Sequence, residues 1–108
     1  MEKNRINSET VLINLGTELD NNNAHEMIKI LTEVNSEGYK KVILDMTNME
    51  FLSSSGVGAI LGMLETFRGQ NGDIILCNLS DKIYHILTVL DLQDYLTIRE
   101  SVDTAVKS

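Results

Sequence analysis

The sequence of 108 residues contains no proline, no tryptophan and a single cysteine, Cys77. One cysteine has no partner for a disulfide and forms no cysteine metal cluster, so both kinds of framework are excluded. Cys77 lies in the apolar run Ile74–Cys77, and we expect a buried, unreactive thiol. Low-complexity tracts and internal repeats are absent too, so nothing marks a linker and the sequence predicts one domain over residues 1–108.

Basic residues are also scarce, because 9 Lys and Arg stand against 16 Asp and Glu for a formal net charge of -7. This balance argues against nucleic-acid binding and against anchoring on an anionic membrane, and it favours a partner with a basic face. No stretch approaches the ~20 apolar residues of a membrane span, and residues 1–5 carry no apolar leader. We therefore expect a cytoplasmic protein, monomeric and without cofactor or metal, whose 43% apolar residues suffice for a core.

What the chain does have is a regular alternation of strand-like and helix-like apolar patterns. The nearly continuous apolar run at 41–46 predicts a central strand buried on both faces. Apolar residues at helical spacing predict a helix from the Ser53–Gly58 turn to about Gly69. Further strands are expected near 5–7, 11–15, 74–78 and 95–99, and further helices after Asn23, Ser80 and Ser101, with these three residues as N-caps. The order β-β-α-β-α-β-α-β-α predicts an α/β domain, a mixed sheet of four to five strands with about four helices packed against it.

Two turns follow strands that this order makes neighbours, Gly16–Asp20 and Thr47–Ser53. Ligands and partners of α/β sheets gather at the carboxyl ends of the strands, so Asp20 and Ser55 are expected on one edge. Asp20 also fits a plain turn residue, and Asp45 is expected to order the turn that follows its strand. The second turn holds three apolar residues that either plug the sheet edge or centre a docking patch: Met49, Phe51 and Leu52.

The most informative segment is Ser53–Gly58, a hydroxyl-rich turn between a buried strand and a helix. Backbone N–H groups at a helix start point outward and favour anions, so such a site suits a phosphate. The plain alternative is an N-cap with solvated neighbours. The glycines of this helix do not fit a dinucleotide fingerprint, and close packing against the sheet or a partner explains them better. His25 and His85 lie on separate helices, which argues against a metal site or a Ser-His dyad.

The run from Val42 to Thr47 and the run from Phe51 to Gly58 together resemble the signature of bacterial anti-sigma factor antagonists of the STAS family. Gly16–Asp20 resembles the other common loop of that family, and the match extends over nearly the whole chain. The resemblance implies a single STAS domain in which the serine before the glycine, Ser55, is phosphorylated by a partner kinase. It further implies that the unphosphorylated form binds an anti-sigma factor serine kinase and frees a sigma factor, while phosphorylation ends binding until a serine phosphatase acts.

One residue departs from the family pattern, because Ser53 stands where the family commonly has aspartate. The change removes a charge beside the expected phosphate and leaves three adjacent hydroxyls as possible acceptors. A phosphate at the start of the helix is expected to leave the fold intact and to act at the interface. The expected partner-binding surface consists of Asp20, Asn21, Ser54, Ser55, Gly56, Val57 and Gly58.

Two other functions stay open from the sequence. The chain can serve as a STAS scaffold within a larger signalling or transport assembly, with the same helix face and no turnover of phosphate. A serine hydrolase is the weakest of the possibilities, because the sequence has no Gly-x-Ser-x-Gly elbow and no placed base. We therefore expect a binding protein rather than an enzyme.

Overall fold

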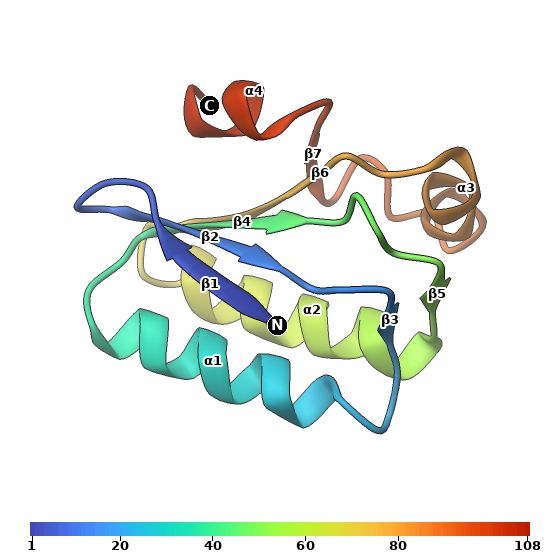
Figure 1. Ribbon diagram of the computed structural model, residues 1–108, viewed down its shortest axis with the longest axis horizontal. Helices are drawn as coiled ribbons and strands as arrows, with labels where there is room; N and C mark the ends of the chain where they lie inside the picture. Colours follow the sequence, from blue (N-terminus) through green and yellow to red (C-terminus); the bar gives the residue numbers. More distant parts are fainter.

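The computed structural model describes residues 1–108 as a mixed five-stranded sheet with helices on both faces (Figure 1). The strand order is β1-β2-β4-β6-β7, in which β1 runs antiparallel to β2 and every other neighbour is parallel. The strands are β1 (Glu2–Arg5), β2 (Thr10–Asn14), β4 (Lys41–Asp45), β6 (Asp73–Cys77) and β7 (Thr97–Arg99). The helices are α1 (Ala24–Ser36), α2 (Ser54–Arg68), α3 (Asp81–Val89) and α4 (Val102–Val106). The predicted α/β architecture is confirmed.

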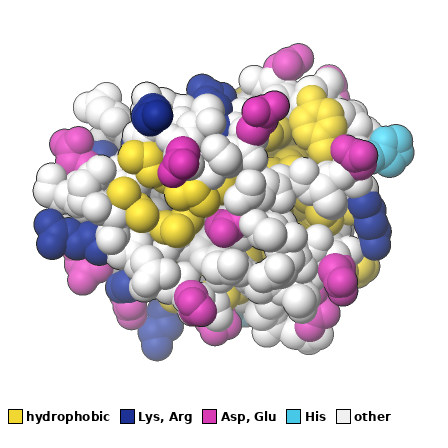
Figure 2. Space-filling model, turned by 45° about the horizontal axis from the view of Figure 1, so that its top comes forward, with side chains coloured by type: hydrophobic (Ala, Val, Ile, Leu, Met, Phe, Trp, Pro, Cys, Tyr) yellow, Lys and Arg dark blue, Asp and Glu magenta, His cyan; other side chains and the backbone are white.

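The main core lies between the sheet and the pair α1 and α2, which run side by side on one face (Figure 1). Val42 and Leu44 of the central strand belong to this core, whereas Ile43 points to the other face, and all three are fully buried. On that other face, Ala105 of α4 packs against Ile43 and its neighbours on β6. The short α4 leaves part of this face open, and Figure 2, which brings the α4 side forward, shows apolar side chains still at the surface.

The helix boundaries follow the predicted caps with one exception. Ser80 and Ser101 each accept a hydrogen bond from a backbone N–H of the first turn, at 3.2 Å, and so cap α3 and α4 as expected. Asn23 precedes α1 as predicted but does not cap it. Its amide instead accepts from the N–H of Asp20 at 2.9 Å and donates to the carbonyl of Glu18 at 2.8 Å. The Asn23 side chain therefore braces the turn that leads into the helix.

The first hairpin forms as predicted, but its outer strand lies closer to the N-terminus than the expected 5–7. β1 covers Glu2–Arg5 and pairs with β2 from Glu2 opposite Asn14 to Arg5 opposite Val11. Asn7 belongs to the turn, because its side-chain oxygen accepts from the N–H of Glu9 at 2.9 Å. An Asx turn of this kind ends the strand before Asn7.

A second sheet, which the sequence did not reveal, stands beyond the carboxyl ends of β2 and β4. It consists of β3 (Glu18–Leu19) and β5 (Phe51–Leu52), which pair in parallel, and we call it the small sheet. Each strand has only two residues, too few for a periodic pattern. Leu19 and Leu52 point into the core, while Glu18 and Phe51 point outward.

None of the helices combines the length and the apolar character needed to cross a membrane; the longest, α2, has 15 residues.

Candidate functional site

The two turns singled out in the sequence meet at one edge of the molecule, as expected from neighbouring parallel strands. β2 and β4 pair directly, and the small sheet continues this contact with Glu18 opposite Phe51 and Leu19 opposite Leu52. One residue further, the N–H of Ser53 donates to the carbonyl of Leu19 at 3.0 Å. The residue after Leu19 is Asp20, so Asp20 and the start of α2 lie side by side. We call this region the carboxyl edge.

Ser53 is the N-cap of α2. Its hydroxyl accepts a hydrogen bond from the N–H of Gly56 at 3.1 Å, and its side chain is half-buried. Aspartate and serine are comparably good N-caps, so the serine found where the STAS family commonly has aspartate preserves the cap and removes only the charge. The turn therefore does cap the helix, as the plain alternative predicted, and Ser53 is the capping residue.

Ser54 and Ser55 are the first two residues of α2, and both are exposed. Neither hydroxyl forms a hydrogen bond within the protein. Their backbone N–H groups belong to the first turn, where an α-helix has no internal acceptor for them. The edge therefore presents two free hydroxyls at the positive end of a helix dipole, where a negative group is favoured.

The next two residues are interior, contrary to the surface expected for all seven candidate residues. A Cβ on Gly56 would lie 2.7 Å from the carbonyl oxygen of Leu19, so the absence of a side chain lets α2 pack directly on β3. Val57 is 5% exposed and belongs to the main core, so its side chain is not at the surface. Gly58 is exposed, and a Cβ there would meet no atom within 4 Å.

Asp20 and Asn21 are half-buried and exposed respectively. One carboxylate oxygen of Asp20 accepts from the N–H of Asn22 at 2.8 Å, and its carbonyl accepts from the N–H of Ala24 at 2.9 Å. Asp20 thus shapes the turn into α1, which agrees with the interpretation of Asp20 as a turn residue. The Asn21 side chain forms no hydrogen bond within the protein.

Asp45 ends β4 and orders the turn after it, as expected. Its carboxylate accepts from the N–H and the hydroxyl of Thr47, at 3.1 and 2.5 Å, and from the amide of Asn78 at 3.1 Å. Partial burial opposes its ionisation, but these hydrogen bonds prevail and hold the pKa of Asp45 below its ordinary value. Burial, and secondly the charge of Asp45, raises the pKa of Cys77 to about 11, so this thiol is protonated and unreactive at neutral pH.

The carboxyl edge is acidic. The segments 15–23 and 46–58, which build it, contain Glu18, Asp20 and Glu50 and no Lys or Arg. In Figure 2 most Lys and Arg side chains lie in the left half of the view, whereas β3, β5 and α3 lie on the right in Figure 1. A partner that docks at this edge meets negative charge.

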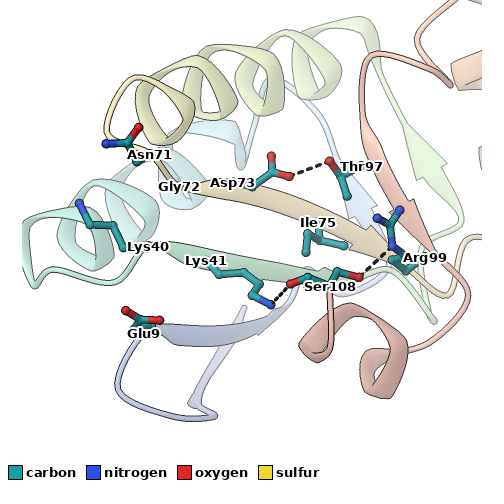
Figure 3. A pocket seen from close by; sticks show the side chains of 10 residues that line it. All are labelled: Glu9, Lys40, Lys41, Asn71, Gly72, Asp73, Ile75, Thr97, Arg99 and Ser108. Atoms are coloured by element: carbon teal, nitrogen blue, oxygen red, sulfur yellow. Dashed lines mark hydrogen bonds between the residues drawn. The ribbon is translucent and has the colours of Figure 1, made fainter.

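A polar cleft of about 350 Å³ lies elsewhere, where β4 and β6 begin (Figure 3). Lys41, on its wall, donates to the carbonyl oxygens of Ala105 and Val106 at 3.3 and 2.9 Å, and Arg99 donates to the hydroxyl of Ser108 at 2.8 Å. These cations hold the end of α4 against the sheet. The cleft is separate from the carboxyl edge, and no group of His, Cys, Asp and Glu in the structure is arranged to hold a metal ion.

Comparison with known proteins relates both the sequence and the fold to one family. The family model of the STAS domain matches residues 3–105. The anti-sigma-B factor antagonist of Staphylococcus aureus is 22% identical over 91 residues, which cover 84% of each chain. A crystal structure of a candidate anti-sigma factor antagonist from Thermotoga maritima superposes with a TM-score of 0.90 at 21% identity, covering 98% of this chain and 91% of the other.

The anti-sigma factor antagonist SpoIIAA is similar in both of its solved forms. The unphosphorylated form gives a TM-score of 0.84 at 25% identity and covers 98% of this chain and 92% of its own. The phosphorylated form, from Bacillus, gives 0.77 at 23% identity and covers 98% and 96%. The family match spans nearly the whole chain, and the fold agrees with it: this protein belongs to the STAS domain family.

Proposed function

We propose that this protein is a phosphorylation-controlled anti-sigma factor antagonist of the cytoplasm. Unphosphorylated, it binds an anti-sigma factor serine kinase and so releases a sigma factor; phosphorylation of Ser55 ends binding, and a serine phosphatase restores it. The observation that carries the proposal is the free, exposed Ser55 hydroxyl at the start of α2. Support comes from the relatives named as anti-sigma factor antagonists and from SpoIIAA, which is solved with and without phosphate.

Among the three serines of the turn, Ser55 fits the acceptor role best. Ser53 is half-buried and its hydroxyl is engaged in the N-cap, so its phosphorylation would remove the cap. Ser54 is exposed like Ser55 and provides the matched control. Ser55 occupies the position before the glycine, which is the acceptor position of the resembled family.

A phosphate on Ser55 is expected to block docking rather than to unfold the domain. It carries a charge of about -1.5 to -2 and would lie among the free N–H groups of the first turn of α2, where a negative charge is stabilised. A kinase that phosphorylates Ser55 must bring nucleotide phosphates close to this hydroxyl, and these repel the product phosphate. Burying the dianion in the interface would also cost several kcal/mol of desolvation.

Two exposed positions of α2 near Ser55 carry no side chain, which fits close approach by a partner. Gly58 and Gly62 are both exposed, and a Cβ at either position would meet no atom of the protein within 4 Å. Glycine inside a helix costs roughly 0.5–1 kcal/mol relative to alanine, and nothing in the isolated domain offsets this cost. A partner surface that packs against the helix backbone would make use of both positions.

The direct test is phosphorylation by the anti-sigma factor kinases of the source organism, purified and supplied with ATP, followed by intact-mass analysis. We expect wild type and Ser54→Ala to gain one phosphate and Ser55→Ala to gain none. Ser55→Asp should weaken kinase binding less than phosphate does, because a single carboxylate carries less charge. Stable binding to a kinase without any phosphorylation would instead support the scaffold function, and equal phosphorylation of Ser55→Ala would remove Ser55 as the acceptor.

A further inference from the structure

The outer face of the small sheet exposes a large aromatic side chain. Phe51 and Glu18 are direct neighbours in the parallel register, and both point away from the core that holds Leu19 and Leu52. Phe51 is 53% exposed although it lies in a strand of a folded domain. It stands on β5, immediately before the α2 start that carries Ser54 and Ser55. The small sheet and the first turn of α2 thus form one continuous surface.

Carboxylates flank this aromatic side chain. Glu50 precedes it in the chain, Glu18 lies opposite it, and Asp20 follows the end of β3. The segments 15–23 and 46–58 have no Lys or Arg, while α3, which contacts β5, carries Lys82. A second copy of the protein would bring the same carboxylates against these, and an anionic membrane would repel them equally. Charge complementarity therefore selects a protein surface that is apolar at its centre and basic around it.

We infer that Phe51 is the apolar anchor of the docking surface, and that the anti-sigma factor covers it with an apolar pocket ringed by Lys and Arg. The inference rests on the proposed function and adds to it the chemistry of the partner's surface. Interface energy concentrates in a few buried side chains, among which aromatic residues are prominent, while surrounding charges act mainly on association rate and specificity. The flanking carboxylates thus attract the partner, and a partner packed closely against Gly58 and Gly62 of α2 leaves no room for a phosphate on Ser55.

The test compares two exposed apolar side chains at different places in the fold. Phe51→Ala removes the proposed anchor, and Val89→Ala truncates a side chain that is 69% exposed at the end of α3. Binding of each purified variant to the purified anti-sigma factor kinases of the source organism is measured by calorimetry, and thermal melting shows that each variant is folded. Phe51→Ser provides a second truncation if Phe51→Ala melts early.

We expect Phe51→Ala to weaken binding by about 30-fold, as for an anchor side chain, and Val89→Ala to leave the affinity within about 2-fold. Replacing Glu18 and Glu50 by glutamine should slow association and flatten its dependence on salt. Tight binding by wild type and equally tight binding by folded Phe51→Ala would overturn the anchor and leave the proposed function standing. Failure of wild type to bind any of the kinases would overturn both.

Discussion

The two edges of the sheet use their polar side chains in opposite ways. At the edge where β4 and β6 begin, which we call the amino edge, long side chains join elements far apart in the sequence, such as Lys41 to Val106 and Arg68 to Tyr95. In the segments 15–23 and 46–58 of the carboxyl edge the side-chain hydrogen bonds are local, such as that from Gly56 to Ser53, and Ser54 and Ser55 form none. The bond from Asn78 to Asp45 joins distant residues next to these segments. The polar side chains of the amino edge therefore hold the fold together, and those of the carboxyl edge stay available for the proposed partner.

The charges of the two edges follow the same division. The basic side chains of the amino edge donate to carbonyl oxygens and to Asp73, which fixes them in place. The carboxylates of the carboxyl edge lie in segments without Lys or Arg. In a protein of net charge -7, Lys40, Lys41 and Arg68 cross-link the chain at the amino edge, whereas the proposed docking surface is acidic. Substitutions at the amino edge should thus change stability, and those at the carboxyl edge should change binding.

The largest effect on stability is expected from Gly56, which lies at the carboxyl edge but has a structural role. Gly56→Ala places a Cβ 2.7 Å from the carbonyl oxygen of Leu19, and this backbone atom has to move. We expect a loss of about 1–3 kcal/mol in the free energy of unfolding, measured by urea denaturation.

Gly58→Ala is the matched control for that substitution. Its Cβ would meet no atom within 4 Å, so we expect a gain of about 0.5–1 kcal/mol in stability together with weaker binding to the kinase. A destabilised Gly58→Ala, or one that binds as wild type does, would contradict the assignment of this helix face to the interface.

Arg68 provides the corresponding test at the amino edge. It pairs with Asp73 at 3.1 Å, donates to the carbonyl of Tyr95 at 2.9 Å and lies over the Tyr95 ring at 5.0 Å. Arg68→Ala removes all three contacts, and because the pair is about one-third exposed we expect a loss of roughly 1–2 kcal/mol by urea denaturation. Kinase binding should stay at the wild-type level, and a loss of affinity in the folded variant would break the division between the edges.

A smaller and pH-dependent effect is expected at Asp45. Hydrogen bonds lower the pKa of this carboxyl below its ordinary 3.8, so the charged form stabilises the fold above about pH 4 and this contribution fades as the pH falls further. Asp45→Asn should be less stable than wild type at pH 7, by under about 1 kcal/mol because the group is largely solvated. Urea denaturation at pH 7 and at pH 3 should show the difference shrinking, and a difference that grows in acid would exclude the charged carboxylate as its source.

The sequence predicts most of the sheet and helices of this fold, because each of these elements is long enough to show its period. The buried run at 41–46, the apolar spacing of α2 and the serines before α3 and α4 all mark real elements. The two strands of the small sheet are not predictable in this way, because they pair only when residues 15–23 and 46–58 meet in space. The three apolar residues of the Thr47–Ser53 turn divide accordingly, with Met49 and Leu52 in the core and Phe51 exposed.

The site is predictable in its place but not in its details. Parallel neighbouring strands bring Asp20 and the α2 start together, as the order of elements indicates. The sequence did not show that Ser53 rather than its neighbours is engaged in the cap, nor that Val57 faces inward, because both depend on where the first turn of α2 begins. The sequence left open whether Phe51 plugs the sheet edge or belongs to a docking patch, because its exposure and its pairing with Glu18 depend on the small sheet.

The central claim is that phosphate on Ser55 acts at the interface and not on the fold. The most direct measurement prepares the protein with and without phosphate on Ser55 and records the melting temperature and the kinase affinity of each form. We predict comparable melting temperatures and an affinity lowered by at least about 10-fold in the phosphorylated form, which corresponds to 1.4 kcal/mol or more. A collapse of the fold on phosphorylation, or an unchanged affinity, would contradict the account.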